Sequence, residues 1–262
     1  MKHNREQQSL RTDTRAASET LGYILLVSVV FFSIFAILSG AVPLIQDQQD
    51  QEYVSNTMKA FDILDNNIDA MENDQAPARE TEIRYRGGEL FLEQQTVMTV
   101  NVEDLETGVV EEETVFLRPI TYRFEDTRIN YEMGAVIRET EDSAHMRNEP
   151  NFEFSKERTK LSPVATTIPE EPRSLGPSGR VAIQKEKTGT QTEILRQQDE
   201  PSDIDLTITI ESERYELWGD YLESHDNVAV TSIDHAQNSV TVTVNTAEVF
   251  FRTTEIQITS RL

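Results

Sequence analysis

The chain lacks cysteine, is poor in lysine and has no acceptor sequence for N-linked sugars. None of its 262 residues is Cys, which excludes disulfides, zinc–thiolate sites and thiol nucleophiles. Asn-x-Ser/Thr occurs nowhere, so we expect no N-glycosylation. Any folded domain must therefore rely on its core alone, which is possible for the roughly 190 residues that follow the first seventy.

Sequence patterns of catalytic and metal-binding sites are also missing. The four histidines show no metal spacing such as H-E-x-x-H, and no G-x-S-x-G nucleophile elbow occurs. Gly87-Gly88 lies between two strand-like segments rather than before a helix, which argues against a phosphate-binding loop. The sequence therefore predicts neither an enzyme nor a bound cofactor or metal.

Acidic side chains greatly outnumber basic ones. The chain has 47 Asp and Glu against 24 Lys and Arg, a formal net charge of −23, so we expect no nucleic-acid partner. The basic residues comprise 18 Arg and only 6 Lys. An acidic, lysine-poor surface favours a halophilic protein, because high salt screens the self-repulsion of the surface. An ordinary acidic protein is the alternative.

One long apolar run stands near the N-terminus. Residues 21–45 form the segment LGYILLVSVVFFSIFAILSGAVPLI, and no residue from Thr20 to Gln46 carries a charge. As a helix it would reach about 37 Å, more than the roughly 30 Å hydrocarbon core of a bilayer. It is longer than the apolar core of a secretory signal, about 7–15 residues. The run predicts a retained transmembrane helix in membrane lipid; a removed signal peptide is the alternative.

The charges on either side of this run predict its orientation. Lys2, Arg5, Arg11 and Arg15 precede it, whereas no Lys or Arg follows it until Lys59. The positive-inside rule then places the N-terminus in the cytoplasm and the C-terminal domain outside the cell. We therefore expect a single-pass protein of the cell membrane.

The residues just before the apolar run are Thr14-Arg15-Ala16-Ala17-Ser18-Glu19-Thr20-Leu21-Gly22. They resemble the class III signal sequence of archaeal type IV pilins and archaellins, especially the R-A-x-S-E-x-x-G form of haloarchaeal pilin-like proteins. In that family a prepilin peptidase cuts on the cytoplasmic side, ahead of the hydrophobic helix. The resemblance covers residues 14–45, and beyond them there is only a loose likeness to pilin-like proteins with large β-rich ectodomains.

The resemblance assigns four processing residues. It makes Arg15 the charged residue ahead of the cut, Ala16 the last residue of the leader and Ala17 the mature N-terminus; a cut after Arg15 stays open. Glu19 would then be the third mature residue, whereas bacterial pilins have Glu at the fifth. The alternative is an uncleaved signal anchor in which this sequence occurs by chance.

The organisation that follows has three parts. Residues 1–16 are a cytoplasmic leader, residues 17–75 an N-terminal helix with its transmembrane span at 21–45, and residues 79–262 an extracytoplasmic β-rich domain. Apolar residues recur every three or four positions after the span, which predicts that the helix continues and packs on the domain. They are Val54, Met58, Phe61, Leu64, Ile68 and Met71. The fold class is α+β with a mainly antiparallel sheet.

Alternation of apolar and polar residues predicts the strands. We expect a hairpin of Glu82–Tyr85 and Glu89–Leu92 around Gly87-Gly88, then an antiparallel meander with one wet face. The meander strands are Thr96–Val102, Val109–Leu117, Ile120–Phe124 and Ile129–Met133. Residues 141–203 hold six of the nine prolines, so we expect irregular connections with two short strands, Leu161–Thr167 and Arg180–Lys185.

The C-terminal part shows the strongest alternation. A strand carries Ile204, Leu206, Ile208 and Ile210 on one face; a short amphipathic helix follows over Glu213–Ser224, with Trp218 as a packing residue. Three more strands are expected at Val228–Ile233, Val240–Val244 and Glu248–Thr259.

These features favour a structural or accessory pilin-like subunit whose partners are the prepilin peptidase and other pilin-like subunits. An uncleaved, membrane-tethered surface-binding module is the alternative. A secreted hydrolase on an anchor has no motif behind it.

Overall fold

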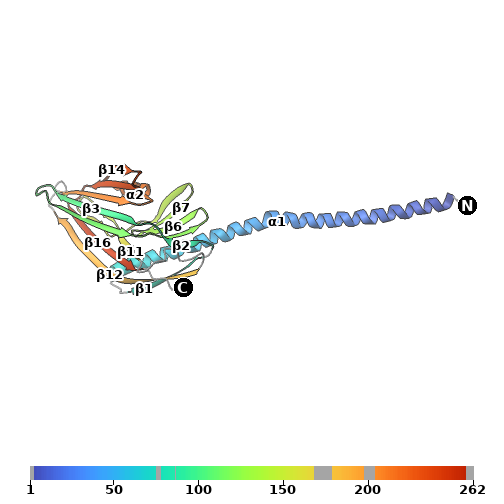
Figure 1. Ribbon diagram of the computed structural model, residues 1–262, viewed down its shortest axis with the longest axis horizontal. Helices are drawn as coiled ribbons and strands as arrows, with labels where there is room; N and C mark the ends of the chain where they lie inside the picture. The colour runs from blue at the N-terminus through green and yellow to red at the C-terminus, as the bar shows by residue number, and fades with distance from the viewer. Residues whose placement is uncertain (1–2, 75–77, 86, 168–178, 198–203, 258–262) are drawn as a thin grey trace. The chain divides into compact units, whose positions relative to one another are not determined.

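The computed structural model describes residues 3–74, 78–85, 87–167, 179–197 and 204–257 (Figure 1). The chain divides into two compact units, residues 1–52 and residues 53–262, and we call the second unit the head. Helix α1 (His3–Asp74) contributes to both. The expected α+β class, with one N-terminal apolar helix and a large, mainly antiparallel β region, is confirmed.

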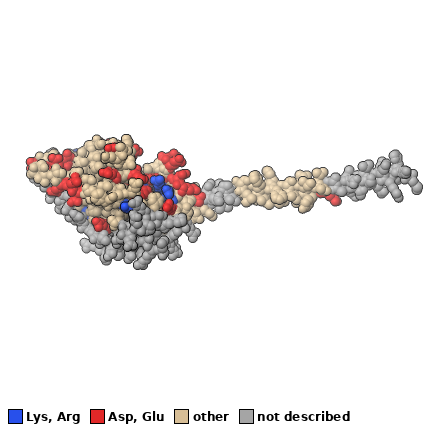
Figure 2. Space-filling model, viewed as in Figure 1, with Lys and Arg blue, Asp and Glu red and all other residues tan. Residues whose placement is uncertain are grey.

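The first unit consists of the N-terminal part of α1 and has an apolar middle. The segment Glu19–Ser39 is 21 residues long, which is long and apolar enough to cross a membrane, and it is 0% buried. Its large side chains lie open, as at Phe31 and Phe35, which are both 68% exposed. Figure 2 shows this stretch without Lys, Arg, Asp or Glu beyond its first residue.

Three sheets build the described part of the head. Sheet 1 has the strand order β1-β12-β16-β10-β9, with β11 also paired to β16. Strands β10 and β11 run parallel to β16, while the other pairings are antiparallel. The bounds in sheet 1 are β1 (Ala78–Tyr85), β9 (Glu153–Phe154), β10 (Thr159–Leu161), β11 (Val164–Thr167), β12 (Gly179–Gln197) and β16 (Glu248–Gln257).

Sheets 2 and 3 are antiparallel throughout their described pairings. Sheet 2 has the order β14-β15-β13-β3-β4, and sheet 3 has the order β2-β5-β6-β7-β8. The strands of sheet 2 are β3 (Thr96–Asp104), β4 (Val110–Leu117), β13 (Ile204–Glu211), β14 (Val228–Asp234) and β15 (Ser239–Val244). The strands of sheet 3 are β2 (Glu89–Leu92), β5 (Ile120–Phe124), β6 (Thr127–Glu132), β7 (Ala135–Thr140) and β8 (Ser143–Asn148).

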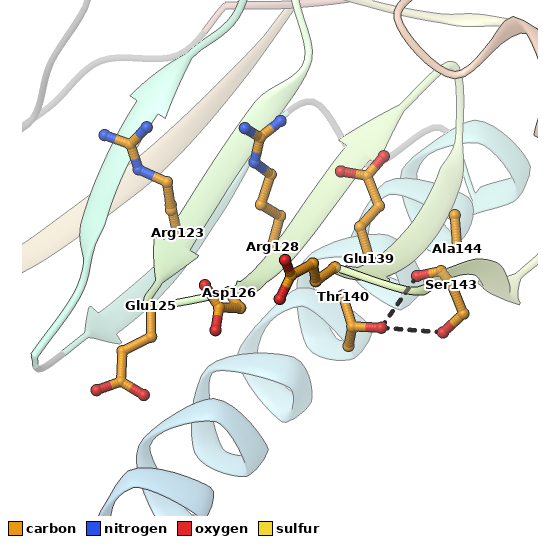
Figure 3. A pocket seen from close by; sticks show the side chains of 9 residues that line it. Arg123, Glu125, Asp126, Arg128, Glu139, Thr140, Ser143 and Ala144 are labelled. Atoms are coloured by element: carbon orange, nitrogen blue, oxygen red, sulfur yellow. Dashed lines mark hydrogen bonds between the residues drawn. The ribbon is translucent and has the colours of Figure 1, made fainter.

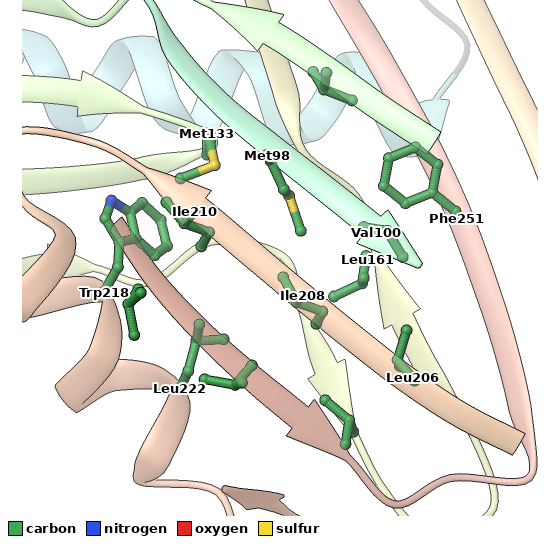
Figure 4. Close-up of a cluster of buried hydrophobic side chains, with 14 of the residues drawn as sticks. Met98, Val100, Met133, Leu161, Leu206, Ile208, Ile210, Trp218, Leu222 and Phe251 are labelled. Atoms are coloured by element: carbon green, nitrogen blue, oxygen red, sulfur yellow. The ribbon is translucent and has the colours of Figure 1, made fainter. Parts of the chain in front are cut away.

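The described residues form two apolar cores, and the first lies on one face of sheet 2. Alternate residues of β13 are buried, as the period of a strand requires, and they pack with Met98 and Val100 of β3 (Figure 4). Helix α2 (Tyr215–Glu223) adds Trp218, whose side chain is fully buried. The packing role expected for Trp218 is therefore confirmed.

The second core joins α1 to sheet 3. Met58, Phe61, Leu64 and Ile68 of α1 are all buried, packed with residues of β1, β2, β5 and β6. The helical stripe predicted from the sequence is thus confirmed at these four positions. The side chain of Met71 lies outside the described residues.

The predicted hairpin over residues 82–92 is wrong, because its two strands belong to different sheets. Strand β1 pairs with β12, and β2 pairs with β5. Gly87 and Gly88 instead lie in the connection from β1 in sheet 1 to β2 in sheet 3. Gly87 has φ of +72°, and a Cβ on Gly88 would lie 2.5 Å from the carbonyl oxygen of Arg123. The single meander is wrong for the same reason, since β3–β4 and β5–β6 lie in separate sheets.

The middle of the chain contains more strand than expected. Strand β12 extends over 19 residues where Arg180–Lys185 was predicted, and β7, β8, β9 and β10 were not predicted as separate strands. Residues 168–178 and 198–203 lie outside the described residues. The C-terminal elements match α2, β13, β14, β15 and the described part of β16 to within a few residues.

Candidate functional site

The predicted processing residues lie at the start of the apolar segment. Arg15, Ala16 and Ala17 are in the helical backbone of α1, and their side chains lie outside the described residues. Glu19 is exposed and is the first residue of the apolar segment. The peptide bond between Ala16 and Ala17 is therefore helical, so a peptidase that needs extended chain must first unwind this turn.

A buried arginine lies where sheets 2 and 3 meet, and the sequence reasoning missed it. Arg214, between β13 and α2, is only 4% exposed. Three carboxylates from sheet 3 surround it: Glu93 after β2, Glu132 at the end of β6, and Glu139 on β7. We call these four residues the Arg214 cluster.

The contacts in the Arg214 cluster are close. An η nitrogen of Arg214 donates to Glu93 Oε2 at 2.5 Å, and the other lies 3.2 Å from Glu132 Oε2. Its Nε lies 2.7 Å from Glu139 Oε1, as an ion pair rather than an aligned hydrogen bond. The remaining oxygen of Glu132 accepts hydrogen bonds from the Thr96 and Ser212 hydroxyls, at 2.7 Å and 2.6 Å.

The Arg214 guanidinium is charged at every accessible pH. Burial alone would lower the pKa of Arg214, but Glu132, Glu93 and Glu139 together raise it well above the ordinary value of 12.5. With partners on β2, β6 and β7, this residue ties α2 and sheet 2 to sheet 3. The cluster therefore stabilises the head rather than forming an open site.

A row of charges crosses sheet 3 at the same face. Directly opposed residues on the five strands are Glu89, Arg123, Arg128, Glu139 and Ala144. Arg123 and Arg128 thus face each other across β5 and β6, and Figure 3 shows their guanidinium groups side by side. Like charges directly opposite each other on a sheet are unfavourable, so we looked for nearby groups that could offset the repulsion between Arg123 and Arg128.

A surface hollow of about 540 Å³ lies beside this row. Arg123, Arg128 and Glu139 line it together with the β5–β6 turn residues Glu125 and Asp126 (Figure 3). The end of β7, the β7–β8 turn and the start of β8 supply Thr140, Glu141, Ser143 and Ala144. We call this the sheet 3 hollow. Its lining carries both signs of charge.

The sequence contained a signal for the arginine pair. Glu125 and Asp126 form a two-residue turn, and such a turn fixes Arg123 opposite Arg128. No comparable local signal marks the Arg214 cluster, because Arg214 is far along the chain from its three carboxylates. Among the described residues, no group of three or more His, Cys, Asp or Glu side chains could hold a metal ion.

Comparison with known families gives one match. The family of unknown function DUF7289 matches residues 15–259. The chain belongs to this family. No curated protein matches, and neither does any solved structure.

The DUF7289 match includes the apolar segment as well as the head. It begins at Arg15, takes in Glu19–Ser39 and extends past the described end of β16 at Gln257. The match thus spans both units of the chain and all three sheets. The Arg214 cluster and the sheet 3 hollow both lie within the matched range.

Proposed function

We propose that this DUF7289 protein is a type IV pilin-like surface protein, anchored in the cell membrane by α1 and carrying the head outside the cell. It acts as a structural or accessory subunit after a prepilin peptidase removes residues 1–16. Membrane lipid and other pilin-like subunits are its partners, and no nucleic acid is involved. The acid-rich, lysine-poor composition supports a halophilic setting for the head.

The contrast between the two parts of α1 carries this proposal. The side chains of Glu19–Ser39 are 0% buried and almost wholly apolar, while Phe61 and Leu64 further along the same helix are fully buried in the head. An exposed apolar surface of this size is unfavourable in water and favours a lipid or protein environment. At about 1.5 Å per residue, 21 residues span about 31 Å, which matches a bilayer core of about 30 Å.

The apolar segment is also suited to packing against copies of itself. Gly22 has no atom within 4 Å of the position of an added Cβ. The hydroxyls of Ser33 and Ser39 donate to the carbonyls of Val29 and Phe35, at 2.8 Å and 2.7 Å, so these residues behave as small satisfied side chains. Small residues let apolar helices approach closely in lipid or in a filament core.

The N-terminus of the protein from its native host tests processing. Mass spectrometry is expected to find Ala17 as the first residue, or Ala16 if the cut follows Arg15. The substitution Arg15→Glu should abolish the cut, because it reverses the charge of the residue that the resemblance places just ahead of the cut. Arg11→Glu makes the same charge change within the leader and should leave processing intact. An intact Met1 in the wild-type protein contradicts the pilin-like proposal.

A second candidate is an uncleaved, membrane-tethered binding module, and the sheet 3 hollow favours it. The hollow presents two arginines and several polar side chains from adjacent strands. Such a module keeps Met1 and needs no partner subunits. The same N-terminal measurement therefore separates the two functions.

A further inference from the structure

In the arginine pair of sheet 3, an ion-pair partner is found among the described residues for Arg123 but not for Arg128. Arg123 donates to Glu89 at 2.9 Å and lies over the Phe91 ring, 5.3 Å from its centroid. Glu139 lies opposite Arg128 on β7, but its carboxylate forms an ion pair with Arg214. Within the residues that the structure describes, the Arg128 guanidinium makes no ion pair or hydrogen bond.

The strand that carries the Arg128 guanidinium is held in the middle of sheet 3. Arg128 is partly buried, and its backbone is paired on both sides, with β5 and with β7. The cation–π contact and ion pair of Arg123 fix the second guanidinium beside it. A guanidinium presents a fork of N–H donors, and a carboxylate accepts such paired N–H bonds.

The rest of the hollow has a different chemistry. Glu125, Asp126 and Glu141 line it with carboxylates, which accept hydrogen bonds from hydroxyl groups. Thr140 and Ser143 add hydroxyls whose oxygens lie 2.9 Å apart, so this side of the hollow is ordered by its own hydrogen bond. The hollow, of about 540 Å³, is open to solvent and has room for one sugar ring.

We propose that the sheet 3 hollow binds a hydroxylated carboxylate of about one sugar ring, a hexuronate. The Arg128 and Arg123 guanidinium groups hold the ligand carboxylate, and the acidic side chains of the two turns accept hydrogen bonds from the ligand hydroxyls. A neutral sugar cannot neutralise Arg128. A polyanionic phosphate or an acidic peptide meets the repulsion of the surrounding carboxylates. The inference concerns the head alone and is independent of how the N-terminus is processed.

Titration calorimetry of the full-length protein in detergent tests this inference, with glucuronate, glucose and acetate as probes. Glucuronate is expected to bind. Glucose, which lacks the carboxylate, and acetate, which lacks the hydroxyls, should bind at least tenfold more weakly. Arg128→Gln should weaken glucuronate binding at least tenfold. Arg128→Lys should restore only part of it, since an ammonium lacks the fork of N–H donors. Arg158→Gln removes an equal charge from the β9–β10 connection and should leave binding unchanged.

Folding of the variants is checked separately by thermal unfolding. Arg128→Gln should not lower the Tm, because it removes a like-charge neighbour of Arg123 and no described contact. A second measurement uses a trimer of uronate units. If the trimer binds more tightly than glucuronate, the natural ligand is a polysaccharide; if the two bind equally, it is a free uronic acid. Both results support the proposed class of ligand. No binding of glucuronate or the trimer overturns the inference. So does equal binding of glucose or acetate, or unchanged glucuronate binding by a folded Arg128→Gln variant.

Discussion

Arg147 of β8 donates three hydrogen bonds to the Asp62 carboxylate of α1. Nε of Arg147 lies 3.0 Å and 3.2 Å from the two carboxylate oxygens of Asp62, and an η nitrogen lies 3.1 Å from Oδ2. The next residue, Asn148, donates to Asp65 Oδ2 at 2.7 Å, one turn further along α1. These contacts set the rotation of the helix on sheet 3, with Phe61 and Leu64 directed into the second core.

Packing, rather than this ion pair, is expected to hold α1 on sheet 3. The Arg147 side chain is 50% exposed, so solvent screens the pair and Arg147→Gln should cost no more than about 1 kcal/mol of unfolding free energy. Phe61 is fully buried, so Phe61→Ala should cost about 3–5 kcal/mol through lost transfer energy and a cavity. Denaturant unfolding of the full-length protein in detergent measures both. Equal losses for the two variants would contradict this ranking.

Loss of the buried arginine should be far more damaging than loss of an exposed one. Arg214→Met leaves Glu93 and Glu132 buried without a counter-charge, at a cost of about 3–5 kcal/mol. Arg158→Met removes an exposed arginine paired with Glu248 and should cost no more than about 1 kcal/mol.

The mechanism of that loss can be checked by neutralising the carboxylates. Adding Glu93→Gln and Glu132→Gln to Arg214→Met should recover part of the stability, because no buried charge then lacks a partner. Denaturant unfolding compares the single and triple variants. If the triple variant is less stable than Arg214→Met alone, uncompensated charge is not the cause.

The crossing between sheets 1 and 3 should depend on a glycine. A Cβ at Gly88 would lie 2.5 Å from the Arg123 carbonyl oxygen and 2.5 Å from the Tyr122 ring, so Gly88→Ala must shift backbone at a cost of about 1–3 kcal/mol. Gly22→Ala meets nothing within 4 Å and serves as the control, since it leaves the head unchanged. Thermal unfolding measures both variants. An unchanged Tm for Gly88→Ala would refute the close approach.

Much of the fold follows from local patterns in the sequence, and the failures have a physical cause. The alternation at Ile204, Leu206, Ile208 and Ile210 predicted β13 because its sheet has one buried face. Residues 82–92 look like a hairpin locally, yet β1 finds its partner about 100 residues later, in β12. Propensity and turn residues contain no information about such long-range pairing, so the prediction failed at that point.

The sites show the same division between local and distant information. Arg123 and Arg128 meet through a two-residue turn, so their pairing is predictable from the hairpin. Arg214 meets Glu93 across 121 residues of chain, and only the three-dimensional fold brings them together. The processing residues Arg15, Ala16, Ala17 and Glu19 rest on family resemblance and stay a prediction.

Alkaline pH should weaken the head through its buried tyrosines. Burial raises the pKa of Tyr85, Tyr122 and Tyr221 above the ordinary value of 10.0, with further raising by Glu89 at Tyr85 and Glu149 at Tyr221. At Tyr122, a hydrogen bond with Thr57 opposes the rise. The unfolded chain therefore loses these protons first, so their contribution is full below pH 10 and declines as pH rises above it.

Denaturant unfolding at pH 8 and pH 11 measures this effect. Stability is expected to be lower at pH 11, and Tyr122→Phe should show a smaller decline than the wild-type protein because one titrating group is gone. Tyrosine absorbance should change together with unfolding. Full ionisation of Tyr85, Tyr122 and Tyr221 in a folded head at pH 11 would contradict the assignment of raised pKa values.

Our central proposal is that the apolar segment, which is long and apolar enough to cross a membrane, does so and leaves the head outside the cell. Protease added to intact cells of the native host, followed by immunoblotting of the membrane fraction, tests it most directly. The account predicts that the head is digested while a short N-terminal fragment containing Glu19–Ser39 stays in the membrane. An undigested head, under conditions that cut known surface proteins, would contradict the account.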